Sequence, residues 1–350
     1  MIRTGIIGTG GMANSHARHF KTIKGCKVLA CCDIVPGKAA QFAQTHNIPT
    51  AYEDTQEMLD KETLDAVSVV TPDSAHCEPS LMAIERGLHV MCEKPLSGNL
   101  KDARRMAQAA RGKRVLTAVN FSYRNAAATQ KAAQIVRSGR LGRIIHVEGC
   151  YLQSWLSSKV WGDWRKLPQL LWRLSIRHGS LGVLGDIGVH LYDLAGFVVG
   201  DFAEIACDLK TFDKGVRRVG EYVLDANDSF VSSVRFANGA IGTLHSSRWA
   251  TGHQNTVALR VWGNDGALDL NLDRPGESQL RGCLGRKAVD KAAWKDIKCP
   301  PVPNMQQRFI TSIKTGRQGQ TSFEGAAAVQ AYLEYSMRSA EKGGFVKIRV

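Results

Sequence analysis

The sequence lacks any long uninterrupted apolar segment. Although 44% of its 350 residues are hydrophobic, no run reaches the roughly 20 apolar residues that a helix needs to cross a bilayer. We therefore expect no transmembrane helix. The opening MIRTGIIGTGG has one arginine, a short apolar run and then glycines, which predicts a first strand and its turn rather than a secretion signal. A cytoplasmic protein is the simplest expectation.

The sequence also lacks a pattern that would organise its nine cysteines. Their number is odd, no CxxC occurs, and the adjacent Cys31 and Cys32 point to opposite faces of a predicted strand. A disulfide framework and a zinc site both need regular cysteine spacing. We expect reduced cysteines that serve as small core residues. The acids and histidines form no ligand cluster beyond one Asp-His pair, so we predict no metal site.

Acidic residues are few relative to basic ones. Forty-six Lys and Arg against 32 Asp and Glu give a formal net charge of +14. The excess is spread along the chain, with denser runs at 101–114, interpreted as the solvated face of a helix, and at 281–298, interpreted as a long exposed loop. Neither run carries a nucleic-acid-binding module, so we predict no nucleic-acid partner. Attraction of a small anionic ligand is a sufficient use for part of the charge.

Residues 1–121 alternate between segments typical of strands and of helices. Nearly all-apolar strands are predicted at 3–8, 27–33, 65–71, 89–93 and 115–120. The first helix between them has an apolar face formed by Met12, Ala13, His16, Phe20 and Ile23. Apolar strands separated by helices are typical of a parallel sheet covered on both faces. We therefore predict a doubly wound α/β domain over residues 1–121.

After about residue 142 the pattern changes to strands with few helices between them. Strands are predicted at 143–151, 228–236, 240–248, 256–263 and 267–272. Turn signals at 238–239 and 264–266 join neighbouring strands as hairpins. One helix is expected around 183–199 and another over 323–342. We predict that residues 122–350 form an α+β domain with a large, mostly antiparallel open sheet.

A glycine-rich turn follows the first predicted strand directly. Gly8, Gly10 and Ala13 give the pattern G-x-G-x-x-A, with Gly11 and Met12 inside it. The first glycine permits a tight turn, the second lets the backbone approach a pyrophosphate, and a small third residue lets the helix pack on the strand. The pattern alone is weak, but its position between a strand and a helix makes it specific. We predict that the turn binds a dinucleotide through Gly8, Gly10, Gly11 and Met12.

Asp33 ends the second predicted strand, 20 residues after Ala13. An acid at this position accepts hydrogen bonds from the hydroxyls of the adenosine ribose and repels the additional phosphate of NADP. NAD is therefore the favoured cofactor. Lys38 lies nearby in the sequence and weakens that preference, so NADP stays possible.

The segment TPDSAHCEPSLMAIERGLHVMCEKPLSGNL at 71–100 resembles the glucose–fructose oxidoreductase and inositol dehydrogenase (Gfo/Idh/MocA) family. The matching residues are Thr71, Pro72, His76, Gly87, His89, Val90, Glu93, Lys94 and Pro95. The segment VLGDIGVHLYDL at 183–194 resembles the Asp-His helix of that family, with the motif residues Asp186, Gly188, His190 and Asp193 in register. The resemblance extends to 119–124, 138–149 and the final helix, and so covers nearly the whole chain.

The resemblance implies a Rossmann domain joined to an open-sheet domain, and homodimers or homotetramers built on the open face of the second sheet. Members of the family oxidise a secondary alcohol of a sugar, cyclitol or diol, or catalyse the reverse reaction. Lys94 and His190 would be catalytic, with Asp186 as their partner. The cofactor would also lie near Thr71, Pro72, His76, Glu93 and Lys94. Two of these have a second interpretation: Glu93 as structural support, and His76 as an ordinary helix-start histidine.

These residue types suit hydride removal from a secondary alcohol. The reaction needs a base near the hydroxyl and a positive field for the developing alkoxide. Lys94 follows a parallel strand, where open α/β sheets bind ligands, and His190 carries an imidazole, a group whose ordinary pKa suits it to accept a proton near neutral pH. Asp186, one helical turn before His190, would orient it or hold a neighbouring hydroxyl. From the residues alone, a self-satisfied structural pair is the alternative.

Four of the seven tryptophans fall within residues 153–179. Aromatic faces stack on sugar rings, and neighbouring Lys and Arg can bind hydroxyls or carboxylates. The predicted substrate-binding residues are Lys94, Tyr123, Trp161, Arg173, Asp186 and His190. A subunit interface or a loop packed on the sheet is the alternative use of this segment.

The chain departs from the family pattern in one place. Many relatives have three consecutive glycines before the Asp-His helix, where this chain has Ser180, Leu181 and Gly182. That difference leaves the sugar unnamed. Two other functions also stay open: a regulator that senses NAD and sugar without catalysis, and a glycosidase that uses tightly held NAD for a transient oxidation.

Overall fold

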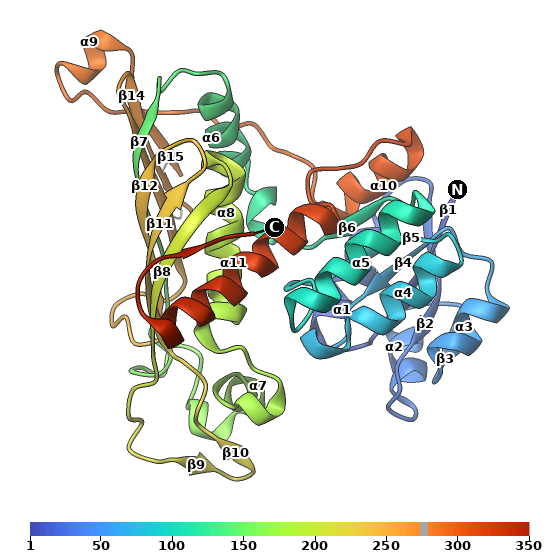
Figure 1. Cartoon of the computed structure of the whole chain (residues 1–350). Coiled ribbons are helices and arrows are strands. Elements are labelled where there is room, and N and C mark those ends of the chain that lie inside the picture. Colours follow the sequence, from blue (N-terminus) through green and yellow to red (C-terminus); the bar gives the residue numbers. More distant parts are fainter. Residues whose placement is uncertain (274–278, 350) are drawn as a thin grey trace. The chain divides into compact units, whose positions relative to one another are not determined.

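The computed structural model describes residues 1–273 and 279–349 and divides the chain into two compact units (Figure 1). Unit 1 comprises Met1–Ser122 and Pro303–Gln330, and unit 2 comprises Tyr123–Val302 and Ala331–Val350. The predicted second domain, 122–350, therefore includes a segment that packs in unit 1. Within the described residues, no helix is both long and apolar enough to span a bilayer.

Unit 1 is built on a parallel sheet with the strand order β3-β2-β1-β4-β5-β6. Its strands are β1 (Ile2–Ile7), β2 (Cys26–Cys32), β3 (Thr50–Tyr52), β4 (Ala66–Val69), β5 (His89–Cys92) and β6 (Thr117–Val119). The three-residue β3 was not predicted, because so short a segment carries no readable periodicity. The strand order reverses between β1 and β4, which is where doubly wound sheets of this order bind dinucleotides.

The unit 1 helices are α1 (Gly11–Lys21), α2 (Lys38–His46), α3 (Thr55–Lys61), α4 (Cys77–Glu85), α5 (Leu100–Lys113) and α10 (Met305–Thr315). Ala13, His16 and Phe20 of α1 are buried, as the periodicity predicts, but Met12 is 53% exposed. Met12 belongs to the first turn of the helix, directly after the glycines. From the distant end of the chain, α10 adds Met305, Phe309 and Ile310 to the core around Phe20, which explains why unit 1 includes it (Figure 1).

Unit 2 is built on a nine-stranded sheet with the order β16-β15-β14-β13-β7-β12-β11-β8-β17. Its strands are β7 (Ile144–Leu152), β8 (Phe202–Lys210), β11 (Ser229–Phe236), β12 (Ile241–Ser247), β13 (Thr256–Gly263), β14 (Gly266–Asn271), β15 (Leu280–Leu284), β16 (Lys295–Asp296) and β17 (Val346–Lys347). β7 pairs with β12 in parallel and the other neighbours pair antiparallel, so the sheet is mixed but mostly antiparallel, as predicted. A separate two-stranded ribbon is formed by β9 (Arg218–Val219) and β10 (Tyr222–Val223).

Two predictions for unit 2 were wrong or incomplete. The basic run at 281–298 is not a long exposed loop: β15 extends the sheet beside β14, and Leu280 and Cys283 are buried. The high density of Lys and Arg concealed this strand. β8 was also missed, because it directly follows a long apolar helix and its apolar and polar residues do not alternate regularly.

The unit 2 helices are α6 (Ala127–Arg137), α7 (Pro168–Leu171), a π-helical turn (Leu184–Gly188) that continues into α8 (Val189–Val199), α9 (Arg286–Val289) and the end of α11 (Phe323–Lys342). α6 and α8 lie on one face of the sheet (Figure 1). α8 is apolar on all sides and almost completely buried, as expected for a central helix. Exposed positions alternate with buried ones along β11, and Val231 and Ile241 are more than half exposed.

Candidate functional site

The glycine-rich turn of unit 1 joins β1 to α1. Gly8 has φ +89°, and a Cβ added there would lie 2.7 Å from the carbonyl carbon of Val70, so the position requires glycine. A Cβ at Gly10 or Gly11 would meet no atom within 4 Å. α1 has no acidic residue in its first turn and no side chain that caps its N-terminus. Free backbone N–H groups beside open space fit a dinucleotide pyrophosphate.

A matched pair of substitutions tests this turn. Gly8→Ala is expected to lower the free energy of unfolding by at least about 1–3 kcal/mol, because the alanine would combine a positive φ with a backbone clash. Gly10 has φ −72°, which alanine adopts freely, so Gly10→Ala is expected to leave that free energy unchanged within about 0.5 kcal/mol. Its methyl group would instead enter the pyrophosphate space and weaken NADH binding about 10-fold. Urea unfolding and NADH fluorescence titration measure both effects, and equal stability of the two variants would contradict the argument.

Asp33 follows β2 and is held beside the glycine turn. Its Oδ2 accepts hydrogen bonds from the backbone N–H and the hydroxyl of Thr9, both at 2.8 Å, and forms an ion pair with Lys38 Nζ at 3.2 Å. Its Oδ1 accepts the N–H of Val35 at 3.1 Å. Burial would raise the pKa of Asp33, but the hydrogen bonds from Thr9 and Val35 and the contact with Lys38 lower it overall. The carboxylate is therefore ionised at neutral pH and suited to accept ribose hydroxyls.

Glu93 and Lys94 follow β5 at the same edge of the sheet. Glu93 Oε1 lies 2.8 Å from His16 Nε2 and accepts the Asn120 amide at 2.6 Å, and Oε2 accepts the backbone N–H of Lys94 at 3.2 Å. His16 is fully buried on α1, with Nδ1 2.8 Å from the hydroxyl of Ser68 on β4. Burial would raise the pKa of Glu93, but His16, Asn120 and the charge of Lys94 lower it to about 2. A buried, ionised carboxylate therefore fixes the main chain at Lys94.

His76 connects two loops of this edge. Its ring is fully buried, with Nδ1 2.8 Å from the carbonyl of Pro95 and Nε2 2.9 Å from the carbonyl of Thr71. The Lys94–Pro95 peptide is cis, and Lys94 itself is half-buried. The N atom of Thr71 lies next to the position that a Gly8 Cβ would occupy, and Pro72 is exposed. Unit 1 thus brings the glycine turn, the 71–72 loop and the Lys94 turn together at the carboxyl ends of β1, β4 and β5.

In unit 2, Asp186 lies in the π-helical turn and is bound by two arginines. Its Oδ2 accepts Arg173 Nε at 3.1 Å and Arg248 Nη2 at 2.9 Å. Arg248 follows β12, is completely buried and also donates from Nη1 to the carbonyl of Arg173 at 2.9 Å. The sequence offered no signal for Arg248 other than a charge at a strand end. A Cβ at Gly188 would lie 2.6 Å from the Phe230 ring, which explains the glycine between the acid and the histidine.

His190 lies in the first turn of α8 against two tyrosines. The Tyr123 ring meets its imidazole edge-on, with centroids 5.1 Å apart. The hydroxyls of Tyr123 and Tyr151 are 2.7 Å apart, and Asn255 binds both, at 3.2 Å and 3.0 Å. Burial raises the pKa of Tyr151 well above its ordinary value, so its phenol stays neutral. Tyr123 was predicted as a site residue. Tyr151, on β7, and Asn255, in the connection between β12 and β13, were not predicted.

The tryptophan-rich segment forms a small core of its own. Trp155, Trp164 and Leu174 are buried in one cluster, and the half-buried Trp161 stacks on Trp155 with centroids 6.5 Å apart. Packing within this cluster thus uses part of the segment, while Trp161 and Arg173 keep partly exposed side chains.

Asp193, the last acid of the Asp-His motif, makes its ion pair away from Asp186 and His190. It forms a buried ion pair with Arg124, whose Nε lies 2.9 Å from Oδ2. Burial raises the pKa of Asp193, and the adjacent guanidinium opposes that effect. Asp193 therefore anchors α8 to the segment before α6.

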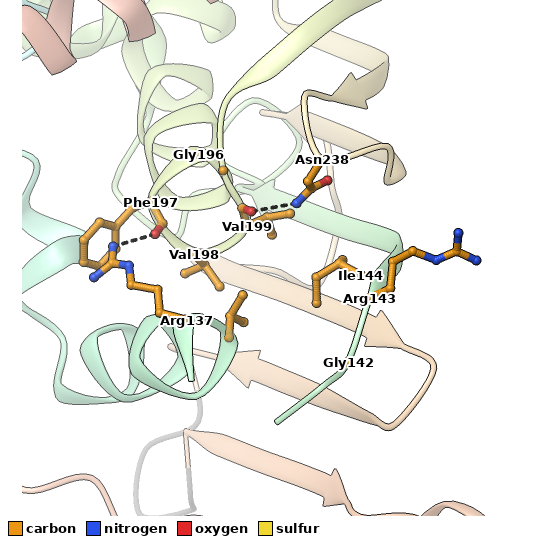
Figure 2. Close-up of a pocket in the computed structure, with 11 residues that line it drawn as sticks. Arg137, Gly142, Arg143, Ile144, Gly196, Phe197, Val198, Val199 and Asn238 are labelled. Atoms are coloured by element: carbon orange, nitrogen blue, oxygen red, sulfur yellow. Dashed lines mark hydrogen bonds between the residues drawn. The ribbon is translucent and has the colours of Figure 1, made fainter. Parts of the chain in front are cut away.

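A pocket with a volume of about 520 Å³ lies elsewhere in unit 2, at the C-terminal ends of α6 and α8. Figure 2 shows the residues that line it. None of the predicted site residues lines it. Its polar side chains bind the last carbonyls of α8: Arg137 donates to Phe197 O at 3.0 Å, and Asn238 donates to Val199 O at 3.0 Å. These contacts complete the helix end.

Comparison with known proteins matches both halves of the chain to one family. Residues 2–121 match the family described as "Oxidoreductase family, NAD-binding Rossmann fold", and residues 129–269 match "GFO/IDH/MocA C-terminal domain". The chain belongs to the Gfo/Idh/MocA oxidoreductase family. As a Gfo/Idh/MocA protein it is an NAD-binding oxidoreductase, and the resemblance found in the sequence is confirmed.

Three relatives illustrate the similarity of this Gfo/Idh/MocA protein. The D-glucoside 3-dehydrogenase of Escherichia coli is 32% identical over 70% of each chain. The levoglucosan dehydrogenase of Pseudarthrobacter phenanthrenivorans is 28% identical over 86% of this chain and 80% of its own. A levoglucosan dehydrogenase structure in complex with NADH and L-sorbose has a TM-score of 0.86 at 25% identity and covers 99% of both chains. The two-domain fold predicted from the sequence is thereby confirmed.

Proposed function

We propose that this protein is a dehydrogenase that transfers a hydride between NAD and a secondary alcohol of a sugar, cyclitol or related polyol. The observation that carries the proposal is the edge of unit 1, where the open glycine turn and the ionised Asp33 lie with Lys94. The relatives named above act, by their names, on D-glucosides and levoglucosan, which supports a carbohydrate substrate.

The chemistry assigns a role to each predicted group. Gly8, Gly10, Gly11 and Met12 would hold the pyrophosphate and Asp33 the adenosine ribose of NAD, which supplies the hydride acceptor. Lys94 provides a positive charge for the developing alkoxide, and His190 accepts the hydroxyl proton. Asp186, fixed by its two arginines, holds a neighbouring hydroxyl of the substrate. Tyr123 and Trp161 offer a hydroxyl and an aromatic face to the rest of the sugar.

The test is NADH formation, followed by absorbance, when the purified protein meets NAD and a panel of sugars, sugar acids, inositols and anhydrosugars. Turnover establishes the dehydrogenase. Binding of NAD and a sugar without turnover would favour the regulator. Cleavage of a chromogenic glycoside with no net NADH, by protein that retains its cofactor through purification, would favour the glycosidase.

The cofactor preference depends on Lys38. Its ammonium partly neutralises Asp33, so the site tolerates the 2′-phosphate of NADP better than a bare carboxylate would. Lys38→Ala is expected to lower kcat/KM with NADP about 10-fold and to leave the value with NAD within a factor of 3, since the phosphate would meet an uncompensated charge. Lys61→Ala, which removes a surface lysine of α3, is the control. Equal losses with both cofactors would refute this role.

We also propose that the protein is a cytoplasmic homodimer or homotetramer that associates through the open face of the unit 2 sheet. The half-exposed Val231 and Ile241, on adjacent strands, give that face apolar area that association would cover. Nine cysteines without a regular spacing suit a reducing compartment. Light scattering on the wild type and on Val231→Lys measures the subunit number, and an unchanged mass in the variant would place the interface elsewhere.

A further inference from the structure

The group around Asp186 carries more positive than negative charge. Two guanidinium groups, Arg173 and Arg248, bind one oxygen of one carboxylate at 3.1 Å and 2.9 Å. The formal charges of these two guanidinium groups and the one carboxylate sum to +1. Arg248 is removed from water completely, so its charge is neutralised by Asp186 at close range rather than by solvent. The remaining charge therefore belongs to Arg173, whose side chain is 31% exposed.

Arg173 is held in place from several sides. Its carbonyl accepts both Arg248 Nη1 at 2.9 Å and the hydroxyl of Ser180 at 2.7 Å. Ser180 is the first of the three residues that replace the family's glycines, so the departure from the family pattern fixes this arginine. The guanidinium also lies over the Trp172 ring, 4.7 Å from its centroid, and Nη1 donates to the carbonyl of Gln169.

This arrangement leaves one edge of the guanidinium for a ligand. Nε is used by Asp186 and Nη1 by Gln169, whereas Nη2 makes no hydrogen bond within residues 1–273 and 279–349. A fixed, partly exposed guanidinium with a free N–H edge is a strong donor site for an anion, because little conformational entropy is lost on binding. Arg173 shares a carboxylate with the buried Arg248, and that carboxylate is four residues from His190.

We propose that the substrate is a sugar acid and that Arg173 binds its carboxylate. This inference rests on the proposed dehydrogenase function and names the substrate class of the same site. A carboxylate brings one negative charge, which balances the formal surplus of +1, whereas the second charge of a phosphate would be repelled by Asp186. A neutral sugar would leave the formal surplus of +1 on the three groups uncompensated, because Asp186 is shared between two guanidinium groups.

The experiment compares acid and neutral partners of the same sugar with NAD: D-glucuronate against D-glucose, D-galacturonate against D-galactose and D-gluconate against D-glucitol. The wild type is expected to prefer the acid of the effective pair at least 10-fold in kcat/KM. Arg173→Gln is expected to raise KM for the acid roughly 10- to 100-fold, the loss of one charge-assisted hydrogen bond. The KM of the neutral partner should rise at least 5-fold less than that of the acid, because Arg248 still holds Asp186 when Arg173 is replaced. Arg173→Lys should restore part of the acid preference, and Arg177→Gln, an exposed neighbour, should match the wild type.

Three results would overturn the proposal: preference for the neutral partner, preference for a sugar phosphate, or equal losses on acid and neutral substrates in Arg173→Gln. If no sugar is oxidised, the proposed function fails, and the inference is then judged by binding alone. For that purpose the melting temperature of the NADH complex is measured with each acid and its neutral partner. Stabilisation by the acid that is lost in Arg173→Gln supports the carboxylate site, and equal or absent stabilisation refutes it.

Discussion

Lys94→Ala is expected to lower kcat about 10³-fold while NADH affinity stays within a factor of 3 of the wild type. The substitution removes the positive charge that stabilises the developing alkoxide, and preorganised charges of this kind contribute about 10²–10⁴-fold to catalysis. The turn itself should survive, because the backbone N–H of residue 94, which alanine keeps, donates to Glu93. Steady-state kinetics with the substrate found in the panel, together with NADH titration, separate the two effects.

Two further variants complete this test. Lys94→Arg keeps the charge but presents a planar, bulkier group with a higher pKa, so it is expected to recover less than one tenth of the activity. Lys101→Ala removes an exposed lysine at the start of α5 and should behave as the wild type. If Lys94→Ala retained wild-type kcat, the assignment of Lys94 would be wrong and His190 would have to serve without it.

The parts of the fold that the sequence predicts are those with a local signal. The parallel strands of unit 1 are almost wholly apolar, and the glycine turn owes its specificity to the strand before it and the helix after it. Segments with a weak or concealed signal were missed: the three residues of β3, the irregularly patterned β8, and β15, which opens a run rich in Lys and Arg. The return of α10 to unit 1 was lost as well, since an amphipathic helix does not reveal which core it covers.

The residues of the candidate site also divide into those with a local sequence signal and those without one. His16 was predicted on the buried face of α1, but its partner Glu93 lies 77 residues away, and no spacing rule connects them. Arg248 and Asp186 are 62 residues apart and meet because β12 ends beside the π-helical turn. The motif identified Asp186 and His190. The groups that fix Asp186 come from other elements, so only the folded chain reveals them.

Glu93→Gln is expected to lower the free energy of unfolding by about 3 kcal/mol at pH 7. Folding lowers the pKa of Glu93 from 4.5 to about 2, so the ionised side chain stabilises the native state fully above about pH 4.5. The contribution falls as the pH drops toward 2, and about half of it should remain at pH 3. The neutral amide of glutamine cannot pair with His16 in the same way, so the variant loses both the stability and its pH dependence.

Urea unfolding of wild type and variant from pH 7 to pH 3 measures this difference. Glu57→Gln, which removes a surface carboxylate paired with Lys61 on α3, should change stability by less than about 0.5 kcal/mol at any of these pH values. In the folded variant, loss of the hydrogen bond that the backbone N–H of Lys94 donates to the Glu93 carboxylate should lower kcat about 10-fold with little change in NADH affinity. A variant as stable as the wild type across the whole range would show that the buried carboxylate is not the group that joins α1 to the turn at Lys94.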